Sequence, residues 1–127
     1  MVQHSLRNDG YCALPFNHMN LHPNGNVSIC CVSKMNGPDS GLANDDNGRM
    51  LNLKTHTIND IFNSYSVNKV REEMLDHKYP TACEGCYKIE QHGGKSRRIT
   101  ENNRWENIEK PQLEFLDIRL SNLCNLK

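Results

Sequence analysis

The chain has 127 residues, of which 36% are hydrophobic and 6% aromatic, enough for one modest core but not for two full domains. Acidic and basic side chains balance, so no global field attracts nucleic acid or an anionic membrane, and we expect neither partner. The N-terminus lacks a leader pattern and no apolar run approaches the ~18 residues that span a bilayer, so we expect a cytoplasmic protein.

Residues 16–32 predict a β-hairpin. Pro23 and Gly25 suit a type I turn that a glycine at positive φ closes. On either side of this turn, apolar residues alternate with polar ones, as in two half-buried strands. The alternating residues are Met19, Leu21, Val27, Ile29 and Cys31. Because neighbours in a strand point to opposite faces, we expect only one of Cys30 and Cys31 to be a metal ligand.

Two helices are predicted in the middle of the chain. They follow residues 36–52, which are rich in Gly, Asn and Asp and predict a long solvated loop. Thr57 is an N-cap for a short helix over residues 58–63, and Ser66 begins a second helix that Pro80 ends. One apolar stripe predicts the core face of the second helix. The stripe consists of Val67, Val70, Met74 and Leu75.

The C-terminal third predicts short helices and one strand. A helical turn or two follows Cys86 and ends at Gly93, and Ser96 caps a further helix that runs through Trp105. Residues 113–120 then alternate as a strand does. Its two faces are Phe115, Asp117 and Arg119 on one side and Leu116, Ile118 and Leu120 on the other.

Cysteine is the residue type that indicates chemistry. In a reducing compartment, six thiols favour metal or cluster ligation over disulfides. The candidate metal ligands are Cys12, Cys30, Cys83 and Cys86. Four thiolates suit either a tetrahedral zinc or a cubane iron-sulfur cluster. A single C-x-x-C pair with two isolated partners is unusual for a zinc ribbon and favours the cluster.

Other uses of these residues stay open. His18 or His22 could replace one thiol in a Cys3His zinc site, although a hairpin histidine is more often a surface residue. A thiol redox pair at Cys83 and Cys86 is disfavoured, because no strand and helix of the thioredoxin type precede it. Lys88, Lys95 and Arg97 could partly offset the thiolate charge. The basic pair at 97–98 could bind an anion at a helix start, although such clusters are usually solvated.

Taken in order, the motifs resemble the SPASM and twitch auxiliary domains of radical S-adenosylmethionine (SAM) enzymes. They are Cys12-x-x-Pro15-Phe16, the turn 23–27 leading to Cys30, the helix phrase 58–64, the segment 70–74 and Cys83-x-x-Cys86. The resemblance covers residues 12 to about 98 and implies an α+β fold, a small β-hairpin plus helices around a four-cysteine site. It also implies that these cysteines bind an auxiliary [4Fe-4S] cluster, with Cys30 as the hairpin ligand.

The end of the chain resembles the start of a radical SAM barrel. LEFLDIRLSNLCNLK is similar to a first strand and to the loop whose C-x-x-x-C-x-x-C motif binds the catalytic cluster, and Cys124 takes the first cysteine position. We therefore expect an auxiliary domain over residues 1–110 and, over residues 111–127, the first strand of a truncated α/β barrel. In that barrel Phe115, Asp117 and Arg119 would face inward, and the opposite face of the strand would meet the covering helices.

The resemblance implies a function for the full-length protein. That protein would be a radical SAM enzyme that uses a 5'-deoxyadenosyl radical to abstract hydrogen from a peptide or protein substrate. It would need a second [4Fe-4S] cluster, SAM and an electron donor such as a flavodoxin or ferredoxin. Of the catalytic cysteines only Cys124 is present, so we assign no catalytic residue and expect the fragment to be inactive alone. The alternative is a zinc-stabilised, non-catalytic binding module that uses the same cysteines.

Overall fold

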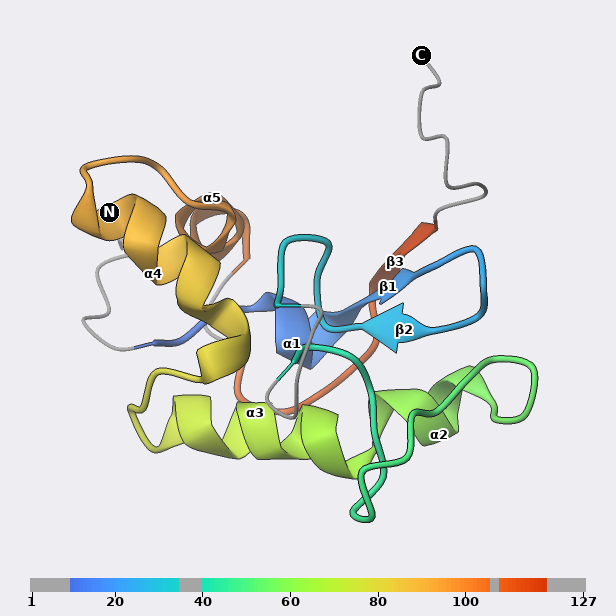
Figure 1. Cartoon of the computed structure of the whole chain (residues 1–127). Helices are drawn as coiled ribbons and strands as arrows, with labels where there is room; N and C mark the ends of the chain where they lie inside the picture. The colour runs from blue at the N-terminus through green and yellow to red at the C-terminus, as the bar shows by residue number, and fades with distance from the viewer. Residues whose placement is uncertain (1–9, 35–39, 106–107, 119–127) are drawn as a thin grey trace.

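The computed structural model describes residues 10–34, 40–105 and 108–118 (Figure 1). Its elements are α1 (Leu14–Asn17), β1 (His18–Leu21), β2 (Val27–Ser28), α2 (Ile58–Phe62), α3 (Tyr65–Leu75), the 3-10 turn η2 (Thr81–Cys83), α4 (Glu84–Gln91), α5 (Arg97–Arg104) and β3 (Phe115–Ile118). In Figure 1, α1 lies between the hairpin on one side and α4 and α5 on the other, above α3. The predicted α+β class, with a hairpin and several helices, is confirmed.

The three strands form one sheet in the order β2-β1-β3. β1 and β2 are antiparallel neighbours. The predicted turn between them is confirmed, because the Gly25 N–H donates to the His22 carbonyl at 3.0 Å and Gly25 has a φ of 93°. β1 is therefore the central strand, and three of its four residues are buried.

The second hairpin strand is shorter than predicted. β2 ends at Ser28, because the Ile29 N–H donates to the Gly41 carbonyl at 2.9 Å and the chain then turns at Cys30. The prediction that Ile29 and Cys31 continue the strand is therefore wrong. Pairing with a distant segment overrides the local alternation.

β3 pairs in parallel with β1 at the other edge of the sheet. Phe115 and Asp117 are partly buried, whereas Leu116 and Ile118 are 38% and 59% exposed, so the predicted alternation holds over the described part of the strand. Arg119 and Leu120 lie outside the described residues. The division between residues 1–110 and 111–127 stays a prediction.

Residues 36–39 of the predicted loop lie outside the described residues, and residues 40–52 are only partly solvated. Leu42 and Ala43 are buried, and isolated bridges pair Leu42 with Ser28 and Asn52 with Asn26. Residues 46–50 are exposed, as predicted. Backbone pairing with the hairpin accompanies the burial of Leu42 and Ala43, which the composition of the loop did not indicate.

The predicted N-cap of α2 is confirmed. The Thr57 hydroxyl accepts the Asp60 N–H at 3.1 Å, and the Asp60 carboxylate accepts the Thr57 N–H at 3.3 Å. This reciprocal arrangement is a capping box, which satisfies two of the backbone donors that a helix start leaves free.

α3 differs from its prediction at both ends. It begins at Tyr65 rather than Ser66, whose hydroxyl instead accepts the Asn44 N–H at 2.7 Å. It ends at Leu75, before Pro80, and His77 follows with a φ of 63°. The helix thus stops at a left-handed residue that the sequence pattern did not predict.

The core face of α3 includes an arginine. Val67, Val70 and Met74 are buried as predicted, but Leu75 is 41% exposed. Arg71 takes its place: the side chain donates from Nε to the Pro15 carbonyl at 2.7 Å, and its guanidinium lies 4.2 Å from the centre of the Phe62 ring. α3 therefore packs against α1 through a hydrogen bond as well as through apolar contacts. The described chain has no helix long and apolar enough to cross a bilayer.

Two adjacent residues of α3 give a matched test of this packing. Met74→Ala should lower the free energy of unfolding by about 2–5 kcal/mol, because Met74 is fully buried and its loss leaves a cavity. Leu75→Ala should cost less than about 1 kcal/mol, since Leu75 is 41% exposed and its truncation leaves no closed cavity. Urea unfolding followed by circular dichroism measures both. Equal losses would show that Leu75 belongs to the core after all.

Candidate metal centre

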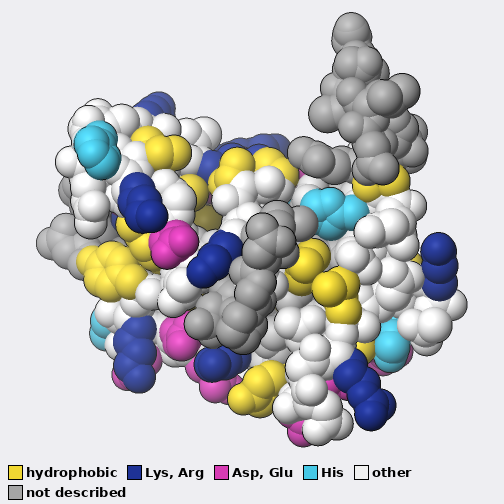
Figure 2. Space-filling view, in the orientation of Figure 1, with side chains coloured by type: hydrophobic (Ala, Val, Ile, Leu, Met, Phe, Trp, Pro, Cys, Tyr) yellow, Lys and Arg dark blue, Asp and Glu magenta, His cyan; other side chains and the backbone are white. Residues whose placement is uncertain are grey.

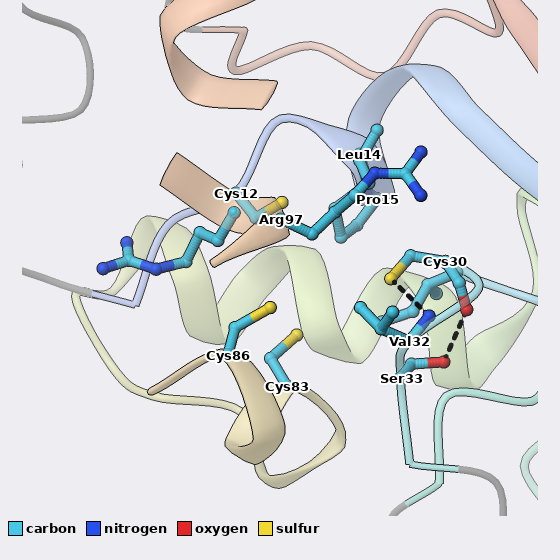
Figure 3. A pocket seen from close by; sticks show the side chains of 11 residues that line it. Cys12, Leu14, Pro15, Cys30, Val32, Ser33, Cys83, Cys86 and Arg97 are labelled. Atoms are coloured by element: carbon cyan, nitrogen blue, oxygen red, sulfur yellow. Dashed lines mark hydrogen bonds between the residues drawn. The ribbon is translucent and has the colours of Figure 1, made fainter. Parts of the chain in front are cut away.

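Four of the six cysteines line one pocket (Figure 3). They are Cys12, Cys30, Cys83 and Cys86, the four that the sequence indicated. Their sulfur atoms come from three separate segments and point toward a shared space, whose volume, counted with its mouth, is about 340 Å³. The remaining wall is mostly apolar, with Leu14, Pro15, Ile29 and Val32, and is completed by Ser33, Arg97 and Arg98. Cys31 is not part of this wall, and Cys124 lies outside the described residues.

A tight turn after β2 directs Cys30 into the pocket. The Cys30 sulfur accepts the Val32 N–H at 3.3 Å, and hydroxyls from Ser28 and Ser33 donate to the Cys30 carbonyl at 3.0 and 2.9 Å. Cys31 takes a different direction, because its sulfur accepts a hydrogen bond from Arg97 at 2.8 Å. The structure thus separates the two adjacent thiols.

Cys83 and Cys86 sit at the start of α4. Cys83 is the N-cap residue and Cys86 lies in the first turn, and residues three apart share one side of a helix. Both thiols therefore face the pocket from the positive end of the helix dipole. The helix begins earlier than predicted, at Glu84, while Gly93 follows its end with a φ of 82°. The Lys34 N–H donates to the Ala82 carbonyl at 2.8 Å, which ties this turn to the end of the hairpin.

α5 holds the backbone on both sides of Cys12. The Asn102 carboxamide accepts the Ala13 N–H at 2.9 Å and donates to the Tyr11 carbonyl at 2.9 Å. Arg98 donates to the same Tyr11 carbonyl at 2.8 Å. α5 begins after the Ser96 cap, as predicted, but nothing in the sequence pattern distinguished this asparagine from a solvated one.

Arg98 joins α4 to α5. The prediction of a solvated basic pair is wrong for this residue, which is only 7% exposed. Its guanidinium donates to both carboxylate oxygens of Glu90, at 2.9 and 2.6 Å, and lies 5.4 Å from the centre of the Tyr87 ring. Burial tends to raise the pKa of Glu90, but hydrogen bonds from Arg98 and Ser96 outweigh it and hold this pKa below its usual value.

The histidines stand apart from the pocket. His18 was expected on the surface but is fully buried in the central strand. Its Nδ1 lies 3.2 Å from the Ile29 carbonyl and its Nε2 lies 2.9 Å from the Asp117 carboxylate. His22 is partly exposed, with Nε2 3.1 Å from the Ser28 hydroxyl. Neither ring lines the pocket.

The electrostatics of the pocket favour a bound cationic centre. Burial raises the pKa of the Cys12 thiol well above its usual value, and the neighbouring Cys83 adds to this rise. Burial likewise raises the pKa of Cys30 and of Cys83 to about 12, against the opposing effect of the Val32 N–H on Cys30. Without a metal, these thiols stay protonated at neutral pH. Thiolates become favourable only when a positive charge is bound among them.

The pocket thiols do not form disulfide bonds. The five cysteines that the structure describes are all free of disulfides. Within the same described residues, no three His, Cys, Asp or Glu side chains gather closely enough to hold a single metal ion. The four pocket cysteines line one space, and four sulfur donors suit a soft centre such as zinc or an iron-sulfur cluster.

Two neighbouring asparagines of α5 test whether the hydrogen bonds of Asn102 to Tyr11 and Ala13, here called the clamp, hold Cys12 in place. Asn102→Ala should lower the free energy of unfolding by about 1–3 kcal/mol, because the buried Ala13 N–H loses its acceptor, and should reduce the metal content of the purified protein. Asn103→Ala, at an exposed position of the same helix, should change stability by less than about 0.5 kcal/mol. Chemical denaturation and metal analysis provide the two readouts. Equal behaviour of the two variants would contradict the clamp.

Comparison with known families agrees with this geometry. The family model for SPASM, described as an iron-sulfur cluster-binding domain, matches residues 12–87, which is more than half of the chain. The matched stretch begins at Cys12 and ends directly after Cys86, so it contains every pocket cysteine. No curated protein and no solved structure matches the chain. By its family match, the chain belongs to the SPASM iron-sulfur cluster-binding domains.

Proposed function

We propose that Cys12, Cys30, Cys83 and Cys86 hold an auxiliary [4Fe-4S] cluster of a radical SAM enzyme. The observation that carries this proposal is the convergence of these four thiols, from three segments of the SPASM-matched region, on one pocket. SPASM domains are typical of radical SAM enzymes, which supports the enzymatic context.

The donor set of this site leaves no iron free for a substrate. Four cysteines complete the coordination of a cubane cluster, one per iron. When bound, such a cluster supplies one-electron transfer and a covalent staple between chain segments. This cross-link stabilises the fold, because the small core alone gives limited stability. The free energy of cluster binding adds to the free energy of folding.

The order of the cysteines along the chain supports a cluster over the zinc alternative. A zinc ribbon usually pairs two C-x-x-C knuckles. The pocket here combines one such pair, Cys83 and Cys86, with the isolated Cys12 and Cys30. A zinc-stabilised, non-catalytic module that uses the same residues remains the outcome that the experiment below must exclude.

The rest of the proposal concerns the full-length enzyme. Cys124 would be the first ligand of the catalytic [4Fe-4S] cluster that binds SAM and generates the 5'-deoxyadenosyl radical. A peptide or protein would be the substrate, and a flavodoxin or ferredoxin would deliver electrons. The similarity of residues 113–127 to the start of a radical SAM barrel supports this assignment. The described residues contribute cluster binding, and the radical chemistry belongs to the remainder of the enzyme.

Metal analysis tests the identity of the centre. Protein purified without oxygen should be brown and should contain iron and acid-labile sulfide in a ratio of about four to four per auxiliary cluster. Removal of the iron with a chelator should loosen the fold, because the metal-free thiols lose their common ligand. A colourless protein with one zinc and no sulfide would overturn the cluster proposal in favour of the zinc module.

The adjacent hairpin cysteines provide a matched pair of variants. Cys30→Ala should abolish the brown colour and the sulfide of the auxiliary cluster, because this thiol lines the pocket. Cys31→Ala should largely retain both, since Cys31 does not line the pocket and its thiol accepts a hydrogen bond from Arg97 instead. Visible absorption and iron content measure the difference. The reverse pattern would assign the ligand role to Cys31.

A further inference from the structure

Arg97 stands between the thiol pocket and two carboxylates. The side chain lines the pocket, and its Nη1 donates to the Cys31 sulfur at 2.8 Å. Its charge acts on the pocket itself: although burial raises the pKa of Cys30, Arg97 is among the groups that oppose the rise. The guanidinium is therefore close enough to interact electrostatically with a charge in the pocket.

Carboxylates from two elements fix this guanidinium. Nε of Arg97 donates to Glu101 on α5 at 3.1 Å, and Nη2 donates to Asp117 on β3 at 3.3 Å. Each carboxylate is held in turn. The Trp105 indole N–H donates to the other oxygen of Glu101 at 3.1 Å, and the His18 ring lies 2.9 Å from Asp117. The position of Arg97 is thus set from both sides.

Asp117 carries its charge in this arrangement. Partial burial tends to raise the pKa of its carboxyl group, but hydrogen bonds with His18 and Arg97 outweigh burial and lower this pKa. The Asp117 side chain is 42% exposed, compared with 7% for Glu101. Solvent therefore screens Asp117 more than Glu101.

Arg98, the other arginine of the pocket wall, has a different role. Glu90 neutralises Arg98 by accepting two hydrogen bonds from its guanidinium. The same guanidinium also donates to the Tyr11 carbonyl beside Cys12. Its removal would disturb the backbone of a proposed ligand. Arg97 donates to the side chains of Cys31, Glu101 and Asp117, so its charge can be changed with less effect on the ligand positions.

A charge next to the pocket matters because reduction of the cluster adds an electron. A [4Fe-4S] core with four thiolates carries a net charge of about −2 when oxidised and about −3 when reduced by one electron from a low-potential donor, and no bond to the protein forms or breaks. A nearby cation stabilises the more negative state, and a nearby anion disfavours it.

We propose that Arg97 raises the reduction potential of the auxiliary cluster and that Asp117, acting through the same contact, lowers it. This inference rests on the proposed function, because it requires the cluster to be present. In this proposal, contacts run from Asp117 on β3 through Arg97 on α5 to the pocket. These contacts set how readily the cluster accepts an electron.

A redox titration of the anaerobically purified chain tests the proposal. With dithionite as reductant and electron paramagnetic resonance as readout, Arg97→Gln should lower the ratio of reduced to oxidised cluster about tenfold at a fixed potential, a downward shift of about 59 mV for a one-electron couple. Asp117→Asn should raise the same ratio about threefold, since this exposed carboxylate is more strongly screened. A titration at pH 8 keeps His18 neutral, because burial lowers its pKa from 6.5.

Two further variants separate charge from structure. Arg97→Lys keeps the charge and should restore the ratio to within about threefold of the unaltered chain. Arg104→Gln removes a charge from the same helix at a site that is 63% exposed and outside the pocket wall, so its midpoint should not move. If Arg97 had a purely structural role, the midpoint potentials of Arg97→Gln and Asp117→Asn would not move in opposite directions.

The possible failures are distinguishable. If the unaltered chain binds zinc and holds no sulfide, the proposed function fails before any titration. If it holds the cluster but Arg97→Gln and Asp117→Asn leave the midpoint unchanged, or move it in the same direction, only the role of Arg97 is overturned. If Arg97→Gln loses its cluster, an unchanged midpoint in Asp117→Asn overturns the proposal and an upward shift supports it.

Discussion

The burial of four thiols around one pocket is the constraint on which this structure depends. In an apolar cavity, thiolate is costly, and burial raises the pKa of Cys12, Cys30 and Cys83 accordingly. A bound cationic centre removes that cost and also links three chain segments. The modest hydrophobic content of the chain makes such a link important. The hairpin, the turn before α4 and the start of α1 are arranged so that each contributes sulfur to the same space.

Charge around the pocket is arranged in two layers. Arg97 and Arg98 form part of the wall, and Glu90, Glu101 and Asp117 lie behind them. Elsewhere on the face shown in Figure 2, basic and acidic side chains are interspersed without a broad patch of either sign. The described surface in that view therefore matches the balanced composition, and organised charge is concentrated beside the cysteines.

Local signals in the sequence predicted the features that depend on neighbours along the chain. The turn at Gly25, the caps at Thr57 and Ser96 and the paired thiols of Cys83-x-x-Cys86 all follow from spacings of a few residues. Long-range contacts explain the misses. β2 ends early because Ile29 bonds to Gly41, and Asn102 meets Ala13 across 89 positions of sequence. Buried Arg71 and His18 likewise acquire partners, Pro15 and Asp117, that no periodic pattern can indicate.

The position of α5 bears on what counts as one folding unit. The recognised family region closes at residue 87, yet the carboxamide that brackets Cys12 lies 15 residues farther on, at position 102. A polypeptide trimmed to the family boundary would keep every proposed sulfur donor and would lose the brace on the first of them. Ligand spacing therefore marks the inorganic site, whereas the protein needed to hold that site extends into the helix beyond it.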